Sequence, residues 1–341
     1  MITIGRLTEF PDERWNDFVL STRQATCFHL SEWAALSKIL CGWEPHYLFA
    51  EEHGTIQAVL PLVHVKSRIA RGALVSTPFC VYGGVVAVNE SCREILENAA
   101  AELARDIDVT HLEVRQVTQT NPRWHSSDLY CSFKKPLLDD IDANLAAIPR
   151  KQRAMVRKGM RADLTATHGH DVDRFYELFA VGMRNLGTPV YPRELISTLV
   201  RLFGDKLEIS IVERQGRPIA SVLSLYFRDE VLPYYAGGLP DARNYAAFDF
   251  MYWDLMRRAV ANGVREFDFG RSMRGSGAFA FKKNWGFEPR QLRYQYDVIH
   301  GRGLPTMDPD KAHFKMLAAI WRKLPAPVAN VLGPFVSRRL Y

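Results

Sequence analysis

The sequence predicts a mixed α/β (α+β) fold made of two tandem units, each a mixed β-sheet flanked by helices. Three observations support this prediction. The chain has 341 residues, more than twice the roughly 150 residues of an ordinary domain. Hydrophobic residues make up 47% and charged residues 24%, so the disordered and fibrous classes are excluded. One order of strands, glycine turns and helices occurs twice along the chain.

Each copy of this order reads as strand, glycine turn, strand, glycine pair, helix and strand. In the first copy these features lie at 47–53, Gly54, 55–65, 81–84, 90–106 and 111–116. In the second copy they lie at 207–214, Gly216, 218–227, 233–238, 246–262 and 265–270. The two turns are 162 residues apart and the two last strands are 154 apart. A longer loop around 67–73 accounts for the difference, and we interpret the pattern as a duplication.

The connections set the predicted domain boundaries. Pro136 ends the first unit, and helices over 172–186 and 193–203 open the second. We predict an N-terminal domain at 1–137, a basic helical linker at 138–170, a C-terminal domain at 171–300 and a helical tail at 301–341. The tail holds one helix over 309–323, which Pro325 and Pro327 then break.

The sequence predicts a cytoplasmic protein with reduced thiols. It has no apolar stretch of about 18 residues, and its first residues lack the layout of a signal peptide. The cysteines occur singly and all precede residue 132, at positions 27, 41, 80, 92 and 131. An odd number of cysteines without C-x-x-C spacing favours free thiols over disulfides or a zinc site.

Basic residues are concentrated in three segments, although the net charge is only +6. Residues 149–163 hold six basic residues and one acidic residue, 271–293 hold six and one, and the tail from 301 holds seven and two. One such segment is more often a solvated surface. Three of the same sign predict a phosphate-bearing partner, which could be a nucleotide, coenzyme A, tRNA or an anionic lipid surface.

Standard catalytic signatures are mostly absent. The sequence has no G-x-S-x-G, H-E-x-x-H or P-loop motif. His168 and His170 lack a third ligand, so a polar loop is predicted there and no metal site. Cys80 has no basic residue near it in sequence, which favours a core thiol over a nucleophile.

The segment 267–287 is the strongest candidate site. A strand ends at Phe269, three glycines permit close backbone approach, and a helix with two lysines follows. Backbone N–H groups at a helix start, together with arginines and a lysine, are suited to an anionic group. The alternative is a surface loop with solvated charges. Three aromatic residues should anchor the helix, at positions Phe279, Phe281 and Trp285.

These residues resemble the Fem aminoacyltransferases and their relatives with tandem GNAT-like acyltransferase domains. The resemblance is strongest to the FemAB-like proteins associated with exosortase/PEP-CTERM systems of Gram-negative bacteria. It covers about residues 10 to 300 in the same order. The matching segments are TPFCVYGG (77–84), IPRKQRAMVRKG (148–159), RNLGTPVYP (184–192), REFDFGRS (265–272) and FKKNWGFEP (281–289).

The resemblance implies an enzyme with two GNAT-like domains that moves an acyl or aminoacyl group onto an amine, in cell-envelope, peptidoglycan or exopolysaccharide metabolism. It implies no tightly bound cofactor and a donor that is aminoacyl-tRNA or acyl-CoA. The acceptor would be a small molecule or lipid-linked. The coenzyme-A signature Q/R-x-x-G-x-G/A is missing after residue 238, and the helical arm of some Fem enzymes is absent. Any tRNA contacts would therefore need the basic linker.

The resemblance also assigns roles to residues. Lys282 falls on the family's Phe-Lys pattern and would stabilise an oxyanion or a phosphate. Apart from the resemblance, Asp268 at the strand end would accept the amine proton, unless it only caps a turn. Predicted substrate-binding residues are Arg184, Asn185, Thr188, Tyr191, Tyr235, Arg271, Ser272 and Lys283. Predicted donor- or phosphate-binding residues are Arg150, Arg153 and Arg157.

Two other functions remain open from the sequence. The chain would be a non-catalytic assembly or binding factor if the fold were kept without its activity. An RNA-binding role would need aromatic residues among the basic ones, and 149–163 has none.

The tail also has two interpretations. Its apolar residues Phe314, Leu317, Ile320, Trp321 and Leu324 suit one helical face. That face would either complete the core of the second domain or rest on anionic lipid, which would make the protein peripherally membrane-associated.

Overall fold

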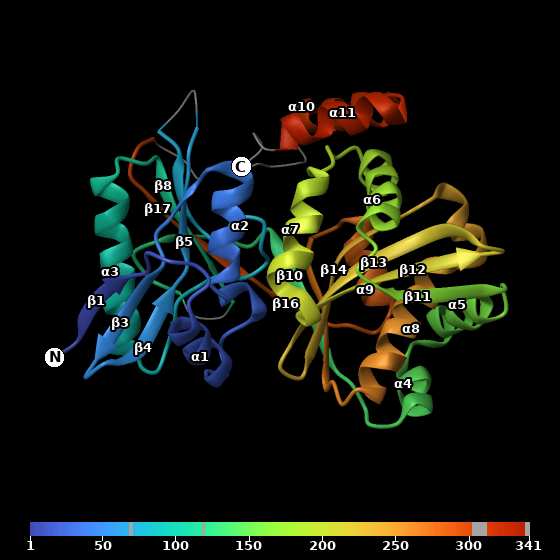
Figure 1. Cartoon of the computed structure of the whole chain (residues 1–341), viewed down its shortest axis with the longest axis horizontal. Coiled ribbons are helices and arrows are strands. Elements are labelled where there is room, and N and C mark those ends of the chain that lie inside the picture. Colours follow the sequence, from blue (N-terminus) through green and yellow to red (C-terminus); the bar gives the residue numbers. More distant parts are fainter. Residues whose placement is uncertain (68–70, 118–119, 302–311, 338–341) are drawn as a thin grey trace. The chain divides into compact units, whose positions relative to one another are not determined.

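The computed structural model describes residues 1–67, 71–117, 120–301 and 312–337 (Figure 1). The chain forms two compact units. Of the described residues, the first consists of Met1–Tyr130 and 291–301, and the second of Cys131–Arg290 and 312–337.

The first unit contains two sheets and three α-helices. The smaller sheet has the order β1-β3-β4-β7, with bounds Thr3–Arg6, Leu48–Glu52, Thr55–Leu60 and Val86–Ala87. The larger has the order β2-β5-β6-β8-β17-β9, with bounds Glu44–Pro45, Leu62–Val65, Ala73–Ser76, His111–Gln116, Arg293–Val298 and His125–Ser127. The helices are α1 (Glu13–Ser21), α2 (Glu32–Cys41) and α3 (Glu90–Asp106).

The second unit is built on one sheet in the order β11-β12-β13-β14-β15-β10-β16. The bounds are Leu164–Gly169, Leu207–Arg214, Arg217–Phe227, Glu230–Gly238, Glu266–Met273, Tyr130–Pro136 and Pro289–Gln291. Its helices are α4 (Ile141–Ala147), α5 (Arg150–Met160), α6 (Val172–Leu186), α7 (Arg193–Phe203), α8 (Ala247–Ala261), α9 (Gly277–Asn284), α10 (Ala312–Lys323) and α11 (Ala326–Ser337). A 3₁₀ turn, η3 (Pro240–Tyr245), precedes α8.

The topology confirms the duplication. The predicted strand over 55–65 is interrupted at Pro61, because proline cannot donate to a strand ladder, and this divides it into β4 and β5. If these two are counted as one strand and the two-residue strands β2 and β7 are set aside, the first unit has the strand order of the second. Both hairpin turns also use two consecutive left-handed residues, His53-Gly54 and Gln215-Gly216.

The compact units are bounded differently from the predicted domains. Residues 131–136 belong to the sheet of the second unit, and β17 belongs to the larger sheet of the first. The predicted linker 138–170 contains α4 and α5, as expected, but also β11, which pairs antiparallel with β12. Strand pairing between residues distant in sequence determines these boundaries, and no local composition shift marks it.

The core of the second unit is rich in aromatic side chains. Phe267 and Phe269 on β15 pack with Trp285, which is fully buried, and with residues of α8. Full burial of each such ring stabilises the fold by about 2–3 kcal/mol. This core fixes β15 and the end of α9 relative to each other.

Two further expectations are settled by the structure. The five cysteines are present as thiols, and Cys80 is fully buried. The tail, however, contains a second helix, because the chain breaks at Leu324–Pro325 and Pro327 then lies in the first turn of α11, where proline is tolerated. Among the described residues, no helix is long and apolar enough to cross a membrane.

Candidate active site

The candidate site lies where strands β14 and β15 separate. They pair in parallel at only two positions, Glu230 with Glu266 and Val231 with Phe267, although β14 continues to Gly238 and β15 to Met273. The first unit has the same arrangement, with two parallel pairs between β6 and β8. Separated strands leave backbone edges that an extended ligand can pair with.

Helix α9 brings Lys282 to β15. Ser276 caps the helix, since its Oγ accepts the backbone N–H of Phe279 at 3.2 Å. The ring of Phe279 lies edge-on to Phe133 of β10, and Phe281 packs near Trp285. The predicted aromatic anchoring is therefore present, and it holds the helix in one orientation.

Lys282 is almost completely buried, with 9% of its surface exposed. Its Nζ donates hydrogen bonds to the carbonyl oxygens of Arg271 at 2.9 Å and Gly270 at 3.4 Å, and it lies 5.5 Å from the centre of the Phe133 ring. Burial lowers its pKa to about 8, while the charge of Asp268 acts to raise it. An ammonium group has three N–H donors. In the described chain, two donors of Lys282 are used in these hydrogen bonds, and the third can donate to a ligand.

Asp268 points to the opposite face of β15 from Phe267 and Phe269, because side chains alternate along a strand. It is fully buried, and its Oδ1 accepts the backbone N–H of Gly270 at 2.7 Å. This contact is the one expected from a turn cap. The role of Asp268 as proton acceptor remains a prediction.

A second carboxylate near Asp268 was not predicted from the sequence. Burial, together with the negative charge of Asp268, raises the pKa of Glu230 to about 7. Lys134 of β10 forms ion pairs with both Glu230 and Glu266, the latter at 2.9 Å. Glu230 opens a strand next to a turn, a position typical of a solvated residue, so no local signal marked it.

The predicted substrate-binding residues do not form one cluster. Arg271, which contributes to the electrostatics of Lys282, and the buried Ser272 lie on β15 near that lysine. Tyr191 and Tyr235 are also brought together, with ring centroids 5.8 Å apart beside α6. Lys283, Asn185 and Thr188 are exposed or partly exposed to solvent.

Arg184 lies near the C-terminal end of α6, which Gly187 terminates in a left-handed conformation. Its Nε donates to the carbonyl oxygen of Leu324, at the end of α10, at 2.6 Å. The arginine therefore contacts the tail. Its role toward a substrate remains a prediction.

A basic hollow lies between α5 and η3. It has a volume of about 390 Å³ and is lined by Ala154, Lys158, Arg161, Ala162, Asn244 and Tyr245. The predicted Arg150 and Arg157 are exposed on the same helix but do not line the hollow, and Arg153 is half-buried. The basic run marked the right helix in the sequence, but which of its cations face the hollow depends on how α5 packs.

Helix α5 covers the start of α8. A Cβ at Gly159 would lie 2.9 Å from the carbonyl oxygen of Ala246, so only glycine permits this approach. Gln152 also hydrogen-bonds Asp249 in the first turn of α8. Burial raises the pKa of Asp249 to about 6. The two helices are thus closely joined beside the hollow.

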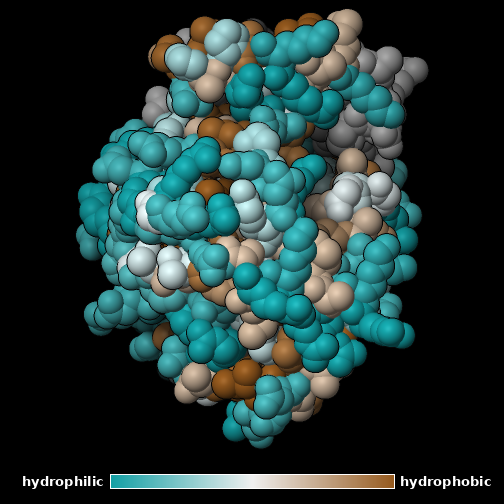
Figure 2. Space-filling model, turned by 90° about the vertical axis from the view of Figure 1, so that its right-hand side faces the viewer, coloured by the Kyte–Doolittle hydropathy of each residue, from teal (hydrophilic) through white to brown (hydrophobic). Residues whose placement is uncertain are grey.

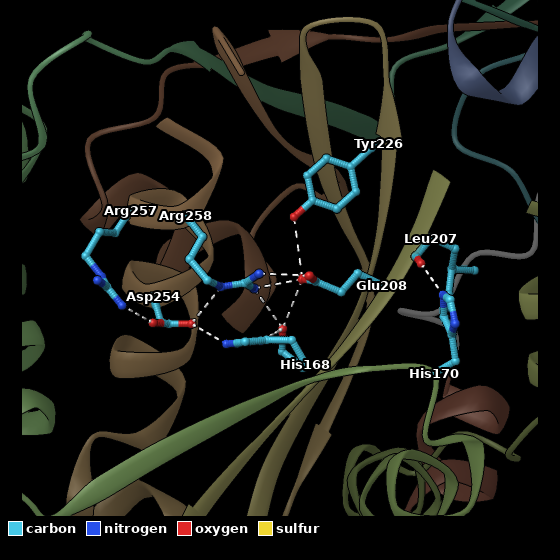
Figure 3. Close-up of polar contacts among 9 residues, drawn as sticks. His168, His170, Leu207, Glu208, Tyr226, Asp254, Arg257 and Arg258 are labelled. Carbon is cyan, nitrogen blue, oxygen red and sulfur yellow. Dashed lines mark hydrogen bonds and ion pairs between the residues drawn. The ribbon is translucent and has the colours of Figure 1, made fainter. Parts of the chain in front are cut away.

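His168 lies on strand β11 and not in the predicted loop, and His170 follows the end of that strand. Figure 3 shows His168 of β11 within a polar network of β12, β13 and α8. Its Nδ1 lies 3.0 Å from Ser210 Oγ, and its Nε2 lies 3.5 Å from Asp254. Arg258 forms a bidentate pair with Glu208, at 2.7 and 2.8 Å.

These paired charges join α8 to the sheet, which indicates a structural role. His170 contacts the carbonyl oxygen of Leu207 instead. Nowhere in the described chain do three metal-ligating side chains gather.

Comparisons with known proteins agree with this architecture. Residues 145–283 match the family described as acetyltransferase (GNAT) domain. A crystal structure of FemX superposes with a TM-score of 0.67 at 13% identity, over 85% of this chain and 96% of that one. No curated protein matches the sequence.

Two other solved structures have the same fold. One is the C-terminal domain of a putative lysylphosphatidylglycerol synthetase from Agrobacterium fabrum, with a TM-score of 0.59, 15% identity and coverage of 85% and 91%. The other is a tandem GNAT protein from the clavulanic acid biosynthesis pathway, with a TM-score of 0.55, 14% identity and coverage of 89% and 100%. The predicted tandem GNAT-like, Fem-like architecture is confirmed. The association with exosortase systems remains a prediction.

Proposed function

Because the chain has a Fem-like tandem GNAT fold, with a GNAT domain at 145–283, we propose that it transfers an acyl or aminoacyl group from an activated donor to an amine. The observation that carries the proposal is the placement of Lys282. A buried cation lies at the separated strands, near Asp268 and Arg271, the groups that shift its pKa. Ammonium groups in such sites stabilise the oxyanion that forms during acyl transfer.

In the proposed reaction, the neutral amine attacks the donor carbonyl and forms a C–N bond. Lys282 stabilises the oxyanion, and a carboxylate accepts one proton from the amine nitrogen. The C–O bond of an aminoacyl ester, or the C–S bond of a thioester, then breaks, and the leaving atom takes up a proton. We assign the base role to Glu230, since its pKa of about 7 lies near neutral pH, where a general base is most effective.

The donor we favour is aminoacyl-tRNA. The coenzyme-A signature is missing, and α5 packs over the first turn of α8, through Gly159 and Gln152. The hollow beside it offers Lys158 and Arg161 to a phosphate group. For the acceptor, we propose an amine of the cell envelope, small or lipid-linked. The solved structures of similar fold include FemX and a putative lysylphosphatidylglycerol synthetase, which favours this class.

Mass spectrometry tests the proposal directly. The purified chain is incubated with charged tRNA or with acyl-CoA, together with candidate amines, and the amines are examined for a mass increase equal to the acyl group. We expect transfer from charged tRNA that requires Lys282. If neither donor supports transfer to any amine, the chain is a non-catalytic binding factor and the proposal is wrong.

A further inference from the structure

Helices α10 and α11 expose their large apolar side chains. Leu317 on α10 is 55% exposed and Phe335 on α11 is 63% exposed. The other exposed large apolar residues of the two helices are Met316, Ile320, Val328, Val331 and Leu332. Figure 2 shows hydrophobic and hydrophilic residues side by side at the top of the molecule, where Figure 1 places these helices.

Helices α10 and α11 form a helical hairpin (312–337). The side of this hairpin that packs against the rest of the second unit consists mainly of small residues and backbone. Ala318 lies close to Gly187. A Cβ added at Gly187 would be 2.6 Å from the carbonyl oxygen of Ala318. Gly333 packs in the same way against Val190, and Ala329 is buried. A tail that completed a domain core would bury its large side chains. In this hairpin the fully buried residues are small, and Trp321 and Leu324 are only half-buried. The first interpretation of the tail therefore does not account for its exposed apolar residues.

The charge of the tail indicates what covers the exposed face. From Lys311 to Tyr341 the sequence has six lysines and arginines and no acidic residue. Of these, Lys315, Arg322 and Lys323 lie on α10 and are exposed. A second copy of the chain would bring two faces of the same positive charge together, which is unfavourable. An anionic surface with an apolar interior complements both properties of the face.

We propose that α10 and α11 form a docking surface for an anionic lipid bilayer. The apolar side chains enter the boundary between headgroups and acyl chains, and the cations contact the headgroups. The helices lie on the membrane and do not span it. This surface is separate from the catalytic proposal and holds whether or not the chain is a transferase.

One consequence does rest on the proposed function. The hairpin contacts the end of α6 through Arg184, which bonds Leu324, and Arg322, which bonds the carbonyl oxygen of Leu186 at 3.4 Å. Directly after that end comes the predicted substrate segment, which includes Thr188 and Tyr191. A docked hairpin would therefore bring this segment near the bilayer, and the acceptor would be a lipid-linked amine.

Vesicle co-sedimentation tests the docking surface without any need for turnover. The full chain is mixed with vesicles of phosphatidylcholine alone, or of phosphatidylcholine with phosphatidylglycerol, at low and at high salt. We expect binding to the anionic vesicles that high salt weakens. The double variant Leu317→Glu, Phe335→Glu should bind about tenfold more weakly. The matched control Val88→Glu, at an exposed valine of the first unit, should bind as wild type.

Three results would overturn the proposal. The first is no binding of the wild type to anionic vesicles at low salt. The second is equal loss of binding in the control, which would attribute the effect to added negative charge in general. The third is a dimer in sedimentation velocity that Leu317→Glu dissociates, which would assign the face to a second copy. Circular dichroism checks that each variant is folded. Transfer to a soluble amine, measured in parallel, should be unchanged in the double variant, so a failed docking surface is distinguishable from a failed transferase.

Discussion

Lys282 and Arg271 are joined by a hydrogen bond of 2.9 Å from the lysine Nζ to the arginine backbone carbonyl. The bond ties α9 to the second half of β15, beside the point at which Gly270 adopts a left-handed conformation. A single side chain thus both holds this irregular part of the strand and places a cation there. The sequence predicted a cation at this position. Because the Lys282 side chain is buried, its removal should lower the free energy of unfolding more than the removal of an exposed lysine.

The first prediction concerns Lys282→Met. The variant keeps the apolar stem and removes the charge, so transfer should fall by about 10²–10³-fold. The loss of hydrogen bonds to two carbonyls should lower the free energy of unfolding by about 1–3 kcal/mol. From the sequence alone we expect a change within about 1 kcal/mol for Lys282→Ala, the range of an exposed substitution. Because the side chain is buried, the structure favours the larger loss. Lys206→Met, at an exposed lysine of the same unit, is the control and should change neither quantity.

The second prediction is a narrow pH optimum of kcat/KM. Glu230 must be ionised to accept a proton, so activity should rise through pH about 7, its pKa. Lys282 must be protonated to stabilise the oxyanion, so activity should fall above pH about 8. Glu230→Gln should lower activity and remove the acidic limb, while Lys282→Met should remove the alkaline limb. An acidic limb that persists unchanged in Glu230→Gln would belong to the substrate amine, and Glu230 would not be the base.

Sequence analysis located elements whose ends have local signals. The bounds of α3 and α6 match their expected ranges, because Asn89 and Asp171 cap their first turns and Gly187 ends α6. Strand pairings between segments far apart in sequence had no such signal. β10 lies beside β15 although more than a hundred residues separate them, and that pairing brings Lys134 to Glu230. The predicted residues around Lys282 are close together in sequence, whereas the missed Glu230 and Lys134 come from β14 and β10.

The third prediction tests the basic hollow. Lys158→Glu and Arg161→Glu should each raise KM for charged tRNA several-fold with little change in kcat, because they act on donor binding and lie apart from the reacting atoms. The salt dependence of binding should also become shallower, as expected when a phosphate contact is lost. Lys151→Glu makes the same charge change on α5 outside the hollow and is the control. Equal effects of all three variants would indicate only a general electrostatic attraction.

The fourth prediction concerns Gly159, on which the packing of α5 against α8 depends. Alanine favours a helix by about 1 kcal/mol over glycine, so propensity alone predicts that Gly159→Ala stabilises the protein. The new Cβ, however, would lie 2.9 Å from both the Ala246 carbonyl oxygen and the Phe250 Cβ, and a backbone oxygen cannot turn away as a side chain can. We therefore expect a net loss of about 1–3 kcal/mol, measured as a lower urea midpoint at unchanged slope. Gly277→Ala is the matched control, since Gly277 is helical and a Cβ added there would meet no heavy atom within 4 Å. This control should be neutral or stabilising.

Because α5 also carries Lys158, Gly159→Ala should raise KM for the donor as well. If Gly159→Ala were as stable as Gly277→Ala and its KM for the donor were unchanged, α5 would not pack tightly on α8. The argument against a coenzyme-A donor would then lose its structural support.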